Sequence, residues 1–151
     1  MDTVLLDQFV ANKIGKPTDF DGNYGPQCVD LVRFYFADVL KMPQPKGVNG
    51  ARDFYEKFES DPVLVKYFTK MPNTLAWIAR KGDVIVWGDG TGKKILPDGR
   101  LIYLGHVGIC LEANLFYLKV FSQNWNQPVA CKIHWHNYLR PKILGGLRPK
   151  F

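Results

Sequence analysis

The chain has 151 residues, of which 46% are hydrophobic and 14% aromatic, and its formal net charge is +6 at pH 7. This length and composition predict one globular domain over residues 1–151 and exclude a disordered chain. No run of about 18 apolar residues occurs, so we expect no membrane-spanning helix, and the acidic start Met1-Asp2 is unlike a signal peptide.

Helical patterns come first along the chain. The hydrophobic spacing predicts helices over residues 3–13, 28–40 and 51–58, with Thr3 and Asn49 as caps of the first and third. A further helical turn is expected to begin at Asp61-Pro62. All of these elements precede the part of the chain that is rich in β-branched residues.

Short runs of β-branched and aromatic residues follow Pro72. They predict strands over residues 84–87, 101–111, 115–121, 129–135 and 143–147. Residues 88–100 are rich in glycine and predict an exposed, mobile hairpin loop. Helices followed by an antiparallel sheet make this an α+β fold.

The positive charge would attract polyanions, such as nucleic acid or anionic wall polymers. The basic residues are scattered, however, apart from short clusters at Lys93-Lys94 and between Arg140 and Lys150. We therefore interpret most of them as a solvated surface and expect no nucleic-acid binding. The surroundings of the three cysteines differ from one another, which indicates free thiols.

Cys28 lies where a polar loop meets the second expected helix. The free N–H groups and the positive dipole end of a helix favour thiolate over thiol, which makes Cys28 a candidate nucleophile. The alternative is a buried apolar filler. That description fits Cys110 and Cys131, because both have apolar neighbours, whereas Cys28 follows Gln27 and precedes Val29-Asp30.

A cysteine nucleophile needs a base, and three histidines are available. His106 has glycines close by in an expected strand, so it lies on a rigid element with open space beside it. His134 and His136 would share one face of a strand. A solvated strand edge is a simpler interpretation of this pair than a metal site. Asn124, at the end of the next strand, could hold His106 in one tautomer, although a polar strand end and turn is the simpler interpretation of this residue by itself.

The order of Cys28, Gly105-His106 and Gln123-Asn124-Trp125, with Gly82-Asp83-Val84-Ile85-Val86-Trp87 ahead of the histidine, resembles the CHAP family of cysteine, histidine-dependent amidohydrolases and peptidases. The resemblance covers almost the whole chain and implies a papain-like fold, with N-terminal helices packed on an antiparallel sheet. It implies Cys28 as nucleophile, His106 as general base and Asn124 as orienting residue. It also implies that Gln27 and the N–H group of Cys28 form the oxyanion hole.

Ser122 departs from the family pattern, because several phage members carry a glutamate at this position. A serine cannot stabilise an imidazolium ion as a carboxylate does. We therefore expect the orienting role to fall on Asn124 alone, as in papain-like sites.

Five oxygen donors between residues 19 and 30, where a loop leads into the second expected helix, have the ligand spacing of an EF-hand loop: Asp19, Asp21, Asn23, the carbonyl of Gly25, and Asp30. Tyr24 stands where the loop normally has glycine, and Asp30 where it has a bidentate glutamate, so binding should be weaker. Phage CHAP domains of this type carry calcium in this loop, so the resemblance implies a structural calcium ion. The alternative is a turn that only caps the helix.

The resemblance implies a phage lysin domain that hydrolyses an amide bond of bacterial peptidoglycan by a Cys-His mechanism, as an N-acetylmuramoyl-L-alanine amidase or an endopeptidase. We expect a monomer without a signal peptide, made in the host cytoplasm and acting on the wall after release or as part of a virion. Anionic wall polymers are a second expected partner. The alternative is a calcium-dependent wall-binding module with weak or no catalysis, which Ser122 and the positive charge favour.

Overall fold

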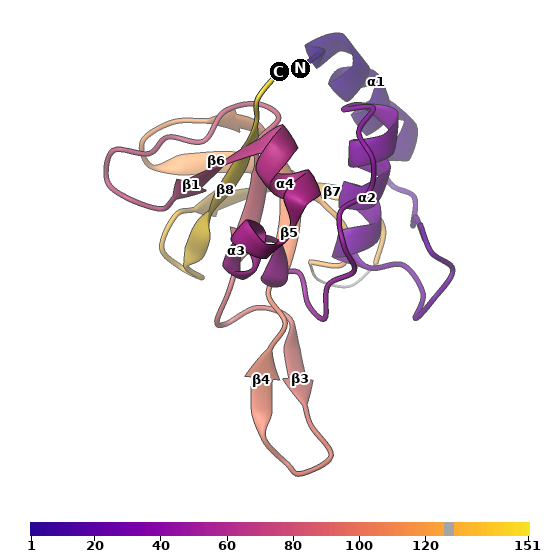
Figure 1. Cartoon of the computed structure of the whole chain (residues 1–151), viewed down its shortest axis with the longest axis vertical. Helices are drawn as coiled ribbons and strands as arrows, with labels where there is room; N and C mark the ends of the chain where they lie inside the picture. The colour runs from indigo at the N-terminus through magenta and orange to yellow at the C-terminus, as the bar shows by residue number, and fades with distance from the viewer. Residues whose placement is uncertain (126–128) are drawn as a thin grey trace.

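A six-stranded antiparallel sheet with the strand order β1-β8-β2-β5-β6-β7 forms the centre of the chain (Figure 1). The computed structural model covers residues 1–151 and describes all of them except 126–128. The strands of this sheet are β1 (Phe68–Pro72), β2 (Val84–Trp87), β5 (His106–Ala113), β6 (Tyr117–Ser122), β7 (Lys132–Asn137) and β8 (Ile143–Pro149). A separate hairpin consists of β3 (Lys93–Ile95) and β4 (Leu101–Tyr103).

Helices cover one face of the sheet, which confirms the α+β class (Figure 1). They are α1 (Thr3–Lys13), α2 (Cys28–Asp38), α3 (Asp53–Glu56), the 3-10 helix η1 (Phe58–Ser60) and α4 (Pro62–Tyr67). Helix α2 packs against β5. It presents a continuous buried stripe because Leu31, Val32, Tyr35 and Phe36 recur one turn apart. No helix of the described residues is both long and apolar enough to cross a membrane.

The sheet has a hydrophobic cluster on each face. Successive strand residues point to opposite faces, so Val84 and Val86 pack toward the helices, while Ile85 and Trp87 point the other way. The second face is closed by Trp77 and other residues of the segments that flank the strands. Both faces of β2 are therefore buried, which agrees with the continuous apolar run that predicted a strand over residues 84–87.

The prediction of one continuous strand over residues 101–111 is wrong. The chain turns at Gly105, whose φ is +78°, so β4 and β5 are separate strands. The expected loop over residues 88–100 likewise contains β3, which pairs with β4. Gly92 makes the turn possible, because a Cβ at this position would lie 2.4 Å from the carbonyl oxygen of Gly105.

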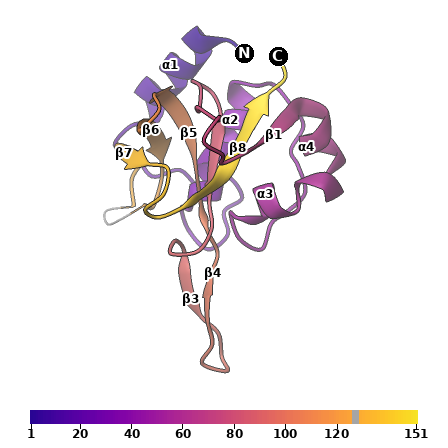
Figure 2. The same cartoon turned by 90° about the vertical axis from the view of Figure 1, so that its left-hand side faces the viewer.

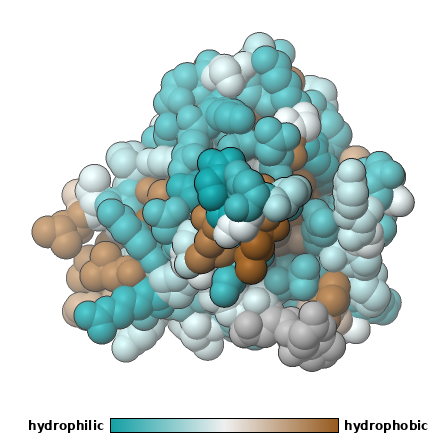
Figure 3. Space-filling model, turned by 90° about the horizontal axis from the view of Figure 1, so that it is seen from below, coloured by the Kyte–Doolittle hydropathy of each residue, from teal (hydrophilic) through white to brown (hydrophobic). Residues whose placement is uncertain are grey.

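The β3-β4 hairpin is an arm that projects away from the sheet (Figures 1 and 2). The guanidinium of Arg52 fastens its base by donating to Asp89 at 2.7 Å and to the carbonyl of Tyr103 at 3.1 Å. Ile95 and Leu101 are exposed along the arm. Seen from the end on which the arm projects, the surface mixes hydrophobic and hydrophilic side chains (Figure 3).

Three further elements differ from expectation. The first helix is capped by the side chain of Asp2 instead of Thr3, and the third is shorter than residues 51–58 and begins after Arg52. Strand β1 was not expected, because only its first residue, Phe68, is buried and it lacks a clear apolar alternation. Its pairing partner is β8, about 80 residues away in the chain, so no local pattern could predict it.

Candidate active site

Cys28 is the first residue of α2, as the hydrophobic spacing predicted. The N–H group of Gln27, just before the helix, donates to Oδ2 of Asp30 at 2.8 Å, and the N–H group of Asp30 donates to the carbonyl of Gln27 at 3.1 Å. These reciprocal bonds define the first turn of the helix. Cys28 is half-buried, and Cys110 and Cys131 are fully buried, as the apolar-filler interpretation required.

The thiol of Cys28 is more protonated than its helical position predicted. Burial raises its pKa to about 11, while the backbone amides of Val107, Val29 and Cys28 itself act in the opposite direction. Desolvation of the charged form therefore outweighs the stabilising N–H groups at the start of the helix. Helix α2 packs against β5, so Cys28 lies on the helix that is next to the strand beginning with His106.

His106 is the first residue of β5 and is 4% exposed. Its ring lies 5.4 Å from the ring of Trp87 and 4.8 Å from that of Trp125. Its pKa is lowered to about 3, chiefly by burial and to a smaller extent by the nearby His136 and His134. The imidazole is therefore neutral at neutral pH, which is the form that can accept a proton.

The sulfur and the imidazole approach the start of β5 from different sides. Val107 packs in the cluster that contains α2, whereas His106 is paired with Trp87 on the other face of the sheet. The hydrogen bonds of the described residues include none between Cys28 and His106. The structure thus brings Cys28 to the strand on which His106 lies, and direct contact between the two side chains stays a prediction.

The other expected catalytic residues lie around this strand end. Gln27 is exposed beside Cys28, and its part in an oxyanion hole stays a prediction. Asn124 is also exposed, has a φ of +60° and bonds through its N–H group to the carbonyl of Val129. No hydrogen bond from its side chain to His106 occurs among the described residues, so its orienting role stays a prediction.

Gln123 is a positioning residue whose role the sequence did not reveal. Its side chain is completely buried, and its amide nitrogen donates to the carbonyls of Gln27 at 2.7 Å and Thr18 at 2.8 Å. Its amide oxygen accepts from the N–H group of Thr18 at 2.6 Å and from the thiol of Cys131 at 3.3 Å. Gln123 therefore fastens the segment before Cys28 to the end of β6. The only signal in the sequence was its place beside Asn124 in the motif.

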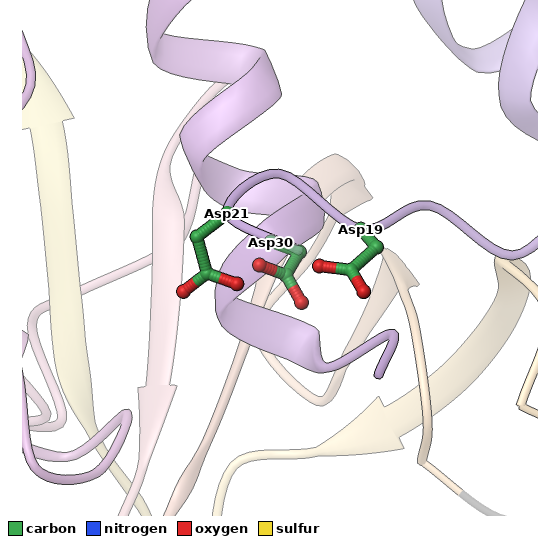
Figure 4. Close-up of side chains that lie close together, drawn as sticks. All are labelled: Asp19, Asp21 and Asp30. Carbon is green, nitrogen blue, oxygen red and sulfur yellow. The ribbon is translucent and has the colours of Figure 1, made fainter. Parts of the chain in front are cut away.

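Two carboxylates of the loop before α2, those of Asp19 and Asp21, and the carboxylate of Asp30 in the first turn of α2 point toward one another (Figure 4). Asp19, Asp21 and Asp30 each offer an oxygen, and these oxygens all lie within 4.8 Å of one another. Asp19 also accepts from the N–H group of Gly22, and Asp21 from that of Asn23, each at 2.8 Å. The structure thus brings together the three aspartates of the expected ligand set.

The chemistry of this donor set fits a hard divalent cation. Burial raises the pKa of Asp30, and the charges of Asp21 and Asp19 raise it further. None of the three carboxylates forms an ion pair with a basic side chain in the part of the chain that the structure describes. Carboxylate oxygens are the ligands that Ca²⁺ prefers, and a cation would relieve the repulsion among them. Asn23 and Gly25 are exposed in the same loop, and their part in ligation stays a prediction.

Comparison with known proteins relates the chain to endolysins. It is 28% identical to endolysin PlyTW of Staphylococcus phage Twort over 154 aligned positions, which cover 96% of this chain and 29% of the phage protein. The chain thus spans less than a third of that relative. No family model matches the sequence.

Solved structures of endolysins share the fold. The wild-type endolysin LysIME-EF1 superposes with a TM-score of 0.61 at 23% identity, over 97% of this chain and 64% of that one. Ly7917, solved with the hydrolysing product of MDP, gives a TM-score of 0.66 at 13% identity, over 99% of this chain and 63% of that one. Helices packed on a mostly antiparallel sheet are thus an arrangement that this chain shares with endolysins.

Proposed function

We propose that this chain is a catalytic domain of a phage lysin and hydrolyses an amide bond in the peptide part of bacterial peptidoglycan. The observation that carries the proposal is the position of Cys28, at the first residue of α2, a helix that packs against the strand beginning with His106. Similarity to a phage endolysin over nearly the whole chain supports the substrate class. Such a domain would meet its substrate after release from the host cell or from a virion.

The proposed reaction proceeds through a thioester. His106 accepts the proton of the Cys28 thiol, and the sulfur attacks the amide carbonyl carbon. The negative oxygen that forms is stabilised by the N–H group of Cys28 and the side-chain amide of Gln27. His106 then gives its proton to the leaving amine, the C–N bond breaks, and water hydrolyses the thioester with His106 again acting as base.

The separation of sulfur and imidazole in the free protein is compatible with this mechanism. Catalytic hydrogen bonds are often long or misaligned without substrate and tighten in the complex. His106 is the first residue of β5, so a change of its side-chain rotamer would alter its contacts with Trp87 and Trp125 but not the strand pairing. Because both groups are neutral when buried, proton transfer would occur with the attack and not before it.

We also propose a structural calcium ion where the loop meets α2, held by Asp19 and Asp21 of the loop and by Asp30 in the first turn of the helix. Asn23 and the carbonyl of Gly25 would complete the coordination. Bound there, the ion would supply charge compensation only. Asp30 also accepts from the N–H group of Gln27, so the ligand set would brace the turn that presents Cys28.

A wall-binding module with weak or no catalysis is the second candidate. It is favoured by the pKa of the Cys28 thiol, raised to about 11 by burial, and by the lack of a described hydrogen bond between the thiol and His106. Such a module would bind peptidoglycan or anionic wall polymers without cleaving them. The two candidates make opposite predictions about a single thiol.

The deciding experiment measures the turbidity of a Gram-positive cell suspension after addition of the protein. We expect the wild type to clear the suspension and Cys28→Ala to pellet with the cells without clearing. Cys131→Ser is the matched control, because it removes another thiol but keeps a hydrogen-bond donor to Gln123. Equal clearing by the wild type and Cys28→Ala would contradict cysteine catalysis, and cell binding without clearing by the wild type would support the module.

A further inference from the structure

Strand β7, at one edge of the main sheet, is partly enclosed by its own chain. Just before this strand, the N–H group of Gly15 donates to the carbonyl of Cys131 at 2.9 Å. Within the strand, His136 is 8% exposed, because the rings of Trp125 and Trp87 lie 4.6 and 4.9 Å from its own. The solvated edge expected at His136 is therefore wrong.

The outer edge of β3, in the arm, has no such cover. The N–H group of Leu104 donates to the carbonyl of Gly92 at 2.8 Å, which makes these two residues a hydrogen-bonded pair. Bonded and non-bonded pairs alternate along an antiparallel ladder, so the N–H and C=O groups of Lys93 and Ile95 point away from β4. Apart from the ladder itself, the hydrogen bonds of the described residues include none to these groups.

The opposite edge of the arm agrees with this alternation and is partly occupied. Tyr103 is paired with Lys93, and its carbonyl accepts from the guanidinium of Arg52 at 3.1 Å. Arg52 also fixes the base of the arm through Asp89. The β3 edge is thus a row of free backbone groups on a fastened hairpin, which an extended peptide can join as a further strand.

The side chains at this edge are basic and apolar. Lys93 and Lys94 form no ion pair in the part of the chain that the structure describes, whereas Arg100 near the tip is paired with Asp98 at 2.6 Å. Ile95 is 65% exposed. Seen from the end on which the arm projects, hydrophobic side chains border hydrophilic ones (Figure 3). A peptide that carries carboxylates and small apolar groups is complementary to this surface.

The arm adjoins the candidate active site. It projects from the end of the sheet at which β5 begins (Figures 1 and 2). Tyr103 precedes His106 by three residues, so Lys93 on the paired strand lies within about 15 Å of His106. An extended peptide of five residues spans about 17 Å. A peptide bound beside His106 can therefore reach the β3 edge.

A lipid surface would also attract basic and apolar side chains. An open strand edge does not enter the hydrocarbon region, however, because its N–H and C=O groups would lose their hydrogen bonds. The free edge of β3 therefore favours a peptide over a membrane. The peptide part of peptidoglycan, with its free carboxylates and alanine side chains, has the required chemistry.

We propose that the β3 edge of the arm is a subsite for an extended peptide segment of the peptidoglycan substrate. The backbone of Lys93 and Ile95 pairs with the peptide, and the ammonium groups of Lys93 and Lys94 attract its carboxylates. This inference rests on the proposed function, because the ligand is the proposed substrate. The arm contributes to affinity and KM and leaves kcat unchanged, since it contacts no reacting atom.

The test measures binding to insoluble peptidoglycan, stripped of wall polymers by acid, in a Cys28→Ala background so that cleavage does not interfere. Ile95→Pro removes an outward N–H group and keeps the ladder, because Ile95 and Leu101 are a non-bonded pair. Leu101→Pro, on the other edge, is the matched control. We expect Ile95→Pro to raise the Kd about three- to tenfold, as loss of one hydrogen bond predicts, and Leu101→Pro to stay within about twofold.

A second pair of variants tests the charges. Lys93→Gln/Lys94→Gln removes two exposed charges of the arm, and Lys41→Gln/Lys66→Gln removes two exposed charges elsewhere. The arm pair should raise the Kd about three- to tenfold, as loss of two exposed ion pairs predicts, and the control pair by less than about twofold. Both pairs change the net charge equally, so general attraction to an anionic wall would affect them alike.

Hydrogen exchange identifies the edge itself. Exchange at the N–H groups of Lys93 and Ile95 should slow when solubilised peptidoglycan fragments bind, whereas exchange at Leu101 should not change. If the proline variants do not fold, the arm can be removed, because an Asn-Gly turn in place of residues 93–103 connects the bonded pair Gly92 and Leu104. This variant should bind at least as weakly as the lysine pair.

The possible failures are distinguishable. Unchanged binding in Ile95→Pro and in Lys93→Gln/Lys94→Gln, with clearing of cells abolished by Cys28→Ala, would overturn the inference and leave the proposed function intact. A loss confined to walls that retain their anionic polymers, or to vesicles of phosphatidylglycerol and phosphatidylcholine, would overturn it in favour of that surface. Clearing by Cys28→Ala equal to that of the wild type would overturn the proposed function itself.

Discussion

At the residue scale, burial controls the charge of both groups expected to react. The sulfur of Cys28 lies at a helix start that favours the anion, yet its enclosure raises its pKa to about 11. The imidazole of His106 is enclosed as well, and its pKa falls to about 3. Between these values the neutral thiol and neutral imidazole are the stable forms. A bound substrate would therefore meet an uncharged pair.

Alkylation of Cys28 by iodoacetamide tests this charge state. Because the raised pKa leaves little thiolate at pH 7, we expect the rate to climb with pH, about tenfold per unit, and to level off only near pH 11. The rate is measured by mass spectrometry between pH 5 and 10, with Cys28→Ala to subtract the two buried thiols. A plateau below pH 8 would contradict the raised pKa and indicate that the helix start stabilises the thiolate.

At the element scale, one buried amide connects the helical and sheet parts of the site. Gln123, at the end of β6, bonds to Thr18 and Gln27 on the segment that leads into α2. These residues are about 100 positions apart in the chain. The location of Cys28 relative to the sheet therefore depends on a side chain that does not react.

Gln123→Leu keeps the volume and removes this connection. The carbonyls of Thr18 and Gln27 lose their buried donor, so we expect the free energy of unfolding to fall by about 3 kcal/mol. Urea denaturation measures this change, and hydrogen exchange at the start of α2 should accelerate. The control is Gln8→Leu on the exposed face of α1, expected to change stability by less than about 0.5 kcal/mol. Similar effects of the two substitutions would contradict a connecting role for Gln123.

The acidic loop before α2 is predicted to gain stability from calcium. The pKa of Asp30 is raised in the folded state, so without a cation the carboxyl favours folding at low pH, and this contribution is lost as pH rises through the folded pKa. A bound calcium ion would offset the cost of ionising Asp30 close to Asp19 and Asp21. We expect saturating calcium to raise Tm by roughly 5–10 °C at pH 7 and by less at pH 4.

Asp21→Asn is the matched variant for this prediction, because it removes one charge and keeps the side-chain shape. It should abolish most of the calcium-dependent shift in a thermal melt, and a chelator should have little effect on it. Asp2→Asn, which changes an aspartate outside the loop, should leave the shift intact. Melting curves of the wild type that coincide with calcium and with chelator would contradict the site.

At the scale of the whole molecule, the sheet separates two hydrophobic clusters, one on each face. A buried ion pair connects the segment just before β2 to the C-terminal strand β8. Asp83, just before β2, is 1% exposed and accepts from Arg148 of β8 at 3.0 and 2.7 Å. The N–H group of Arg80 donates to the same carboxylate at 2.9 Å. The last strand is therefore attached both by its ladder bonds and by this bidentate pair.

Arg148→Met tests how much the ion pair with Asp83 contributes to the free energy of unfolding. It leaves the carboxylate of Asp83 buried without its charge partner, and we expect a loss of about 3–5 kcal/mol in the free energy of unfolding. Asp7→Asn breaks the exposed pair with Lys81, whose atoms are 2.6 Å apart, and should cost less than about 1 kcal/mol. Chemical denaturation compares the two. Equal losses would contradict the importance of burial.

Local patterns in the amino-acid sequence were sufficient to predict several elements. The spacing of apolar residues defined α1 and α2, and the apolar run over residues 84–87 defined β2. The spacing of Asp19, Asp21 and Asp30 likewise anticipated a cluster of oxygen ligands, which the fold brings together. Each of these features depends on residues within a few turns of one another, so short-range periodicity was sufficient.

The arrangement and protonation of the site residues depend on contacts between distant parts of the chain. Strand β1 forms through a partner far away in the chain, and the turn at Gly105 depends on the approach of Gly92. The protonation of Cys28 and the contacts of His136 depend on desolvation by surrounding elements, which no local pattern encodes. Long-range register and burial are properties of the packed chain, and they determine which side chains reach His106.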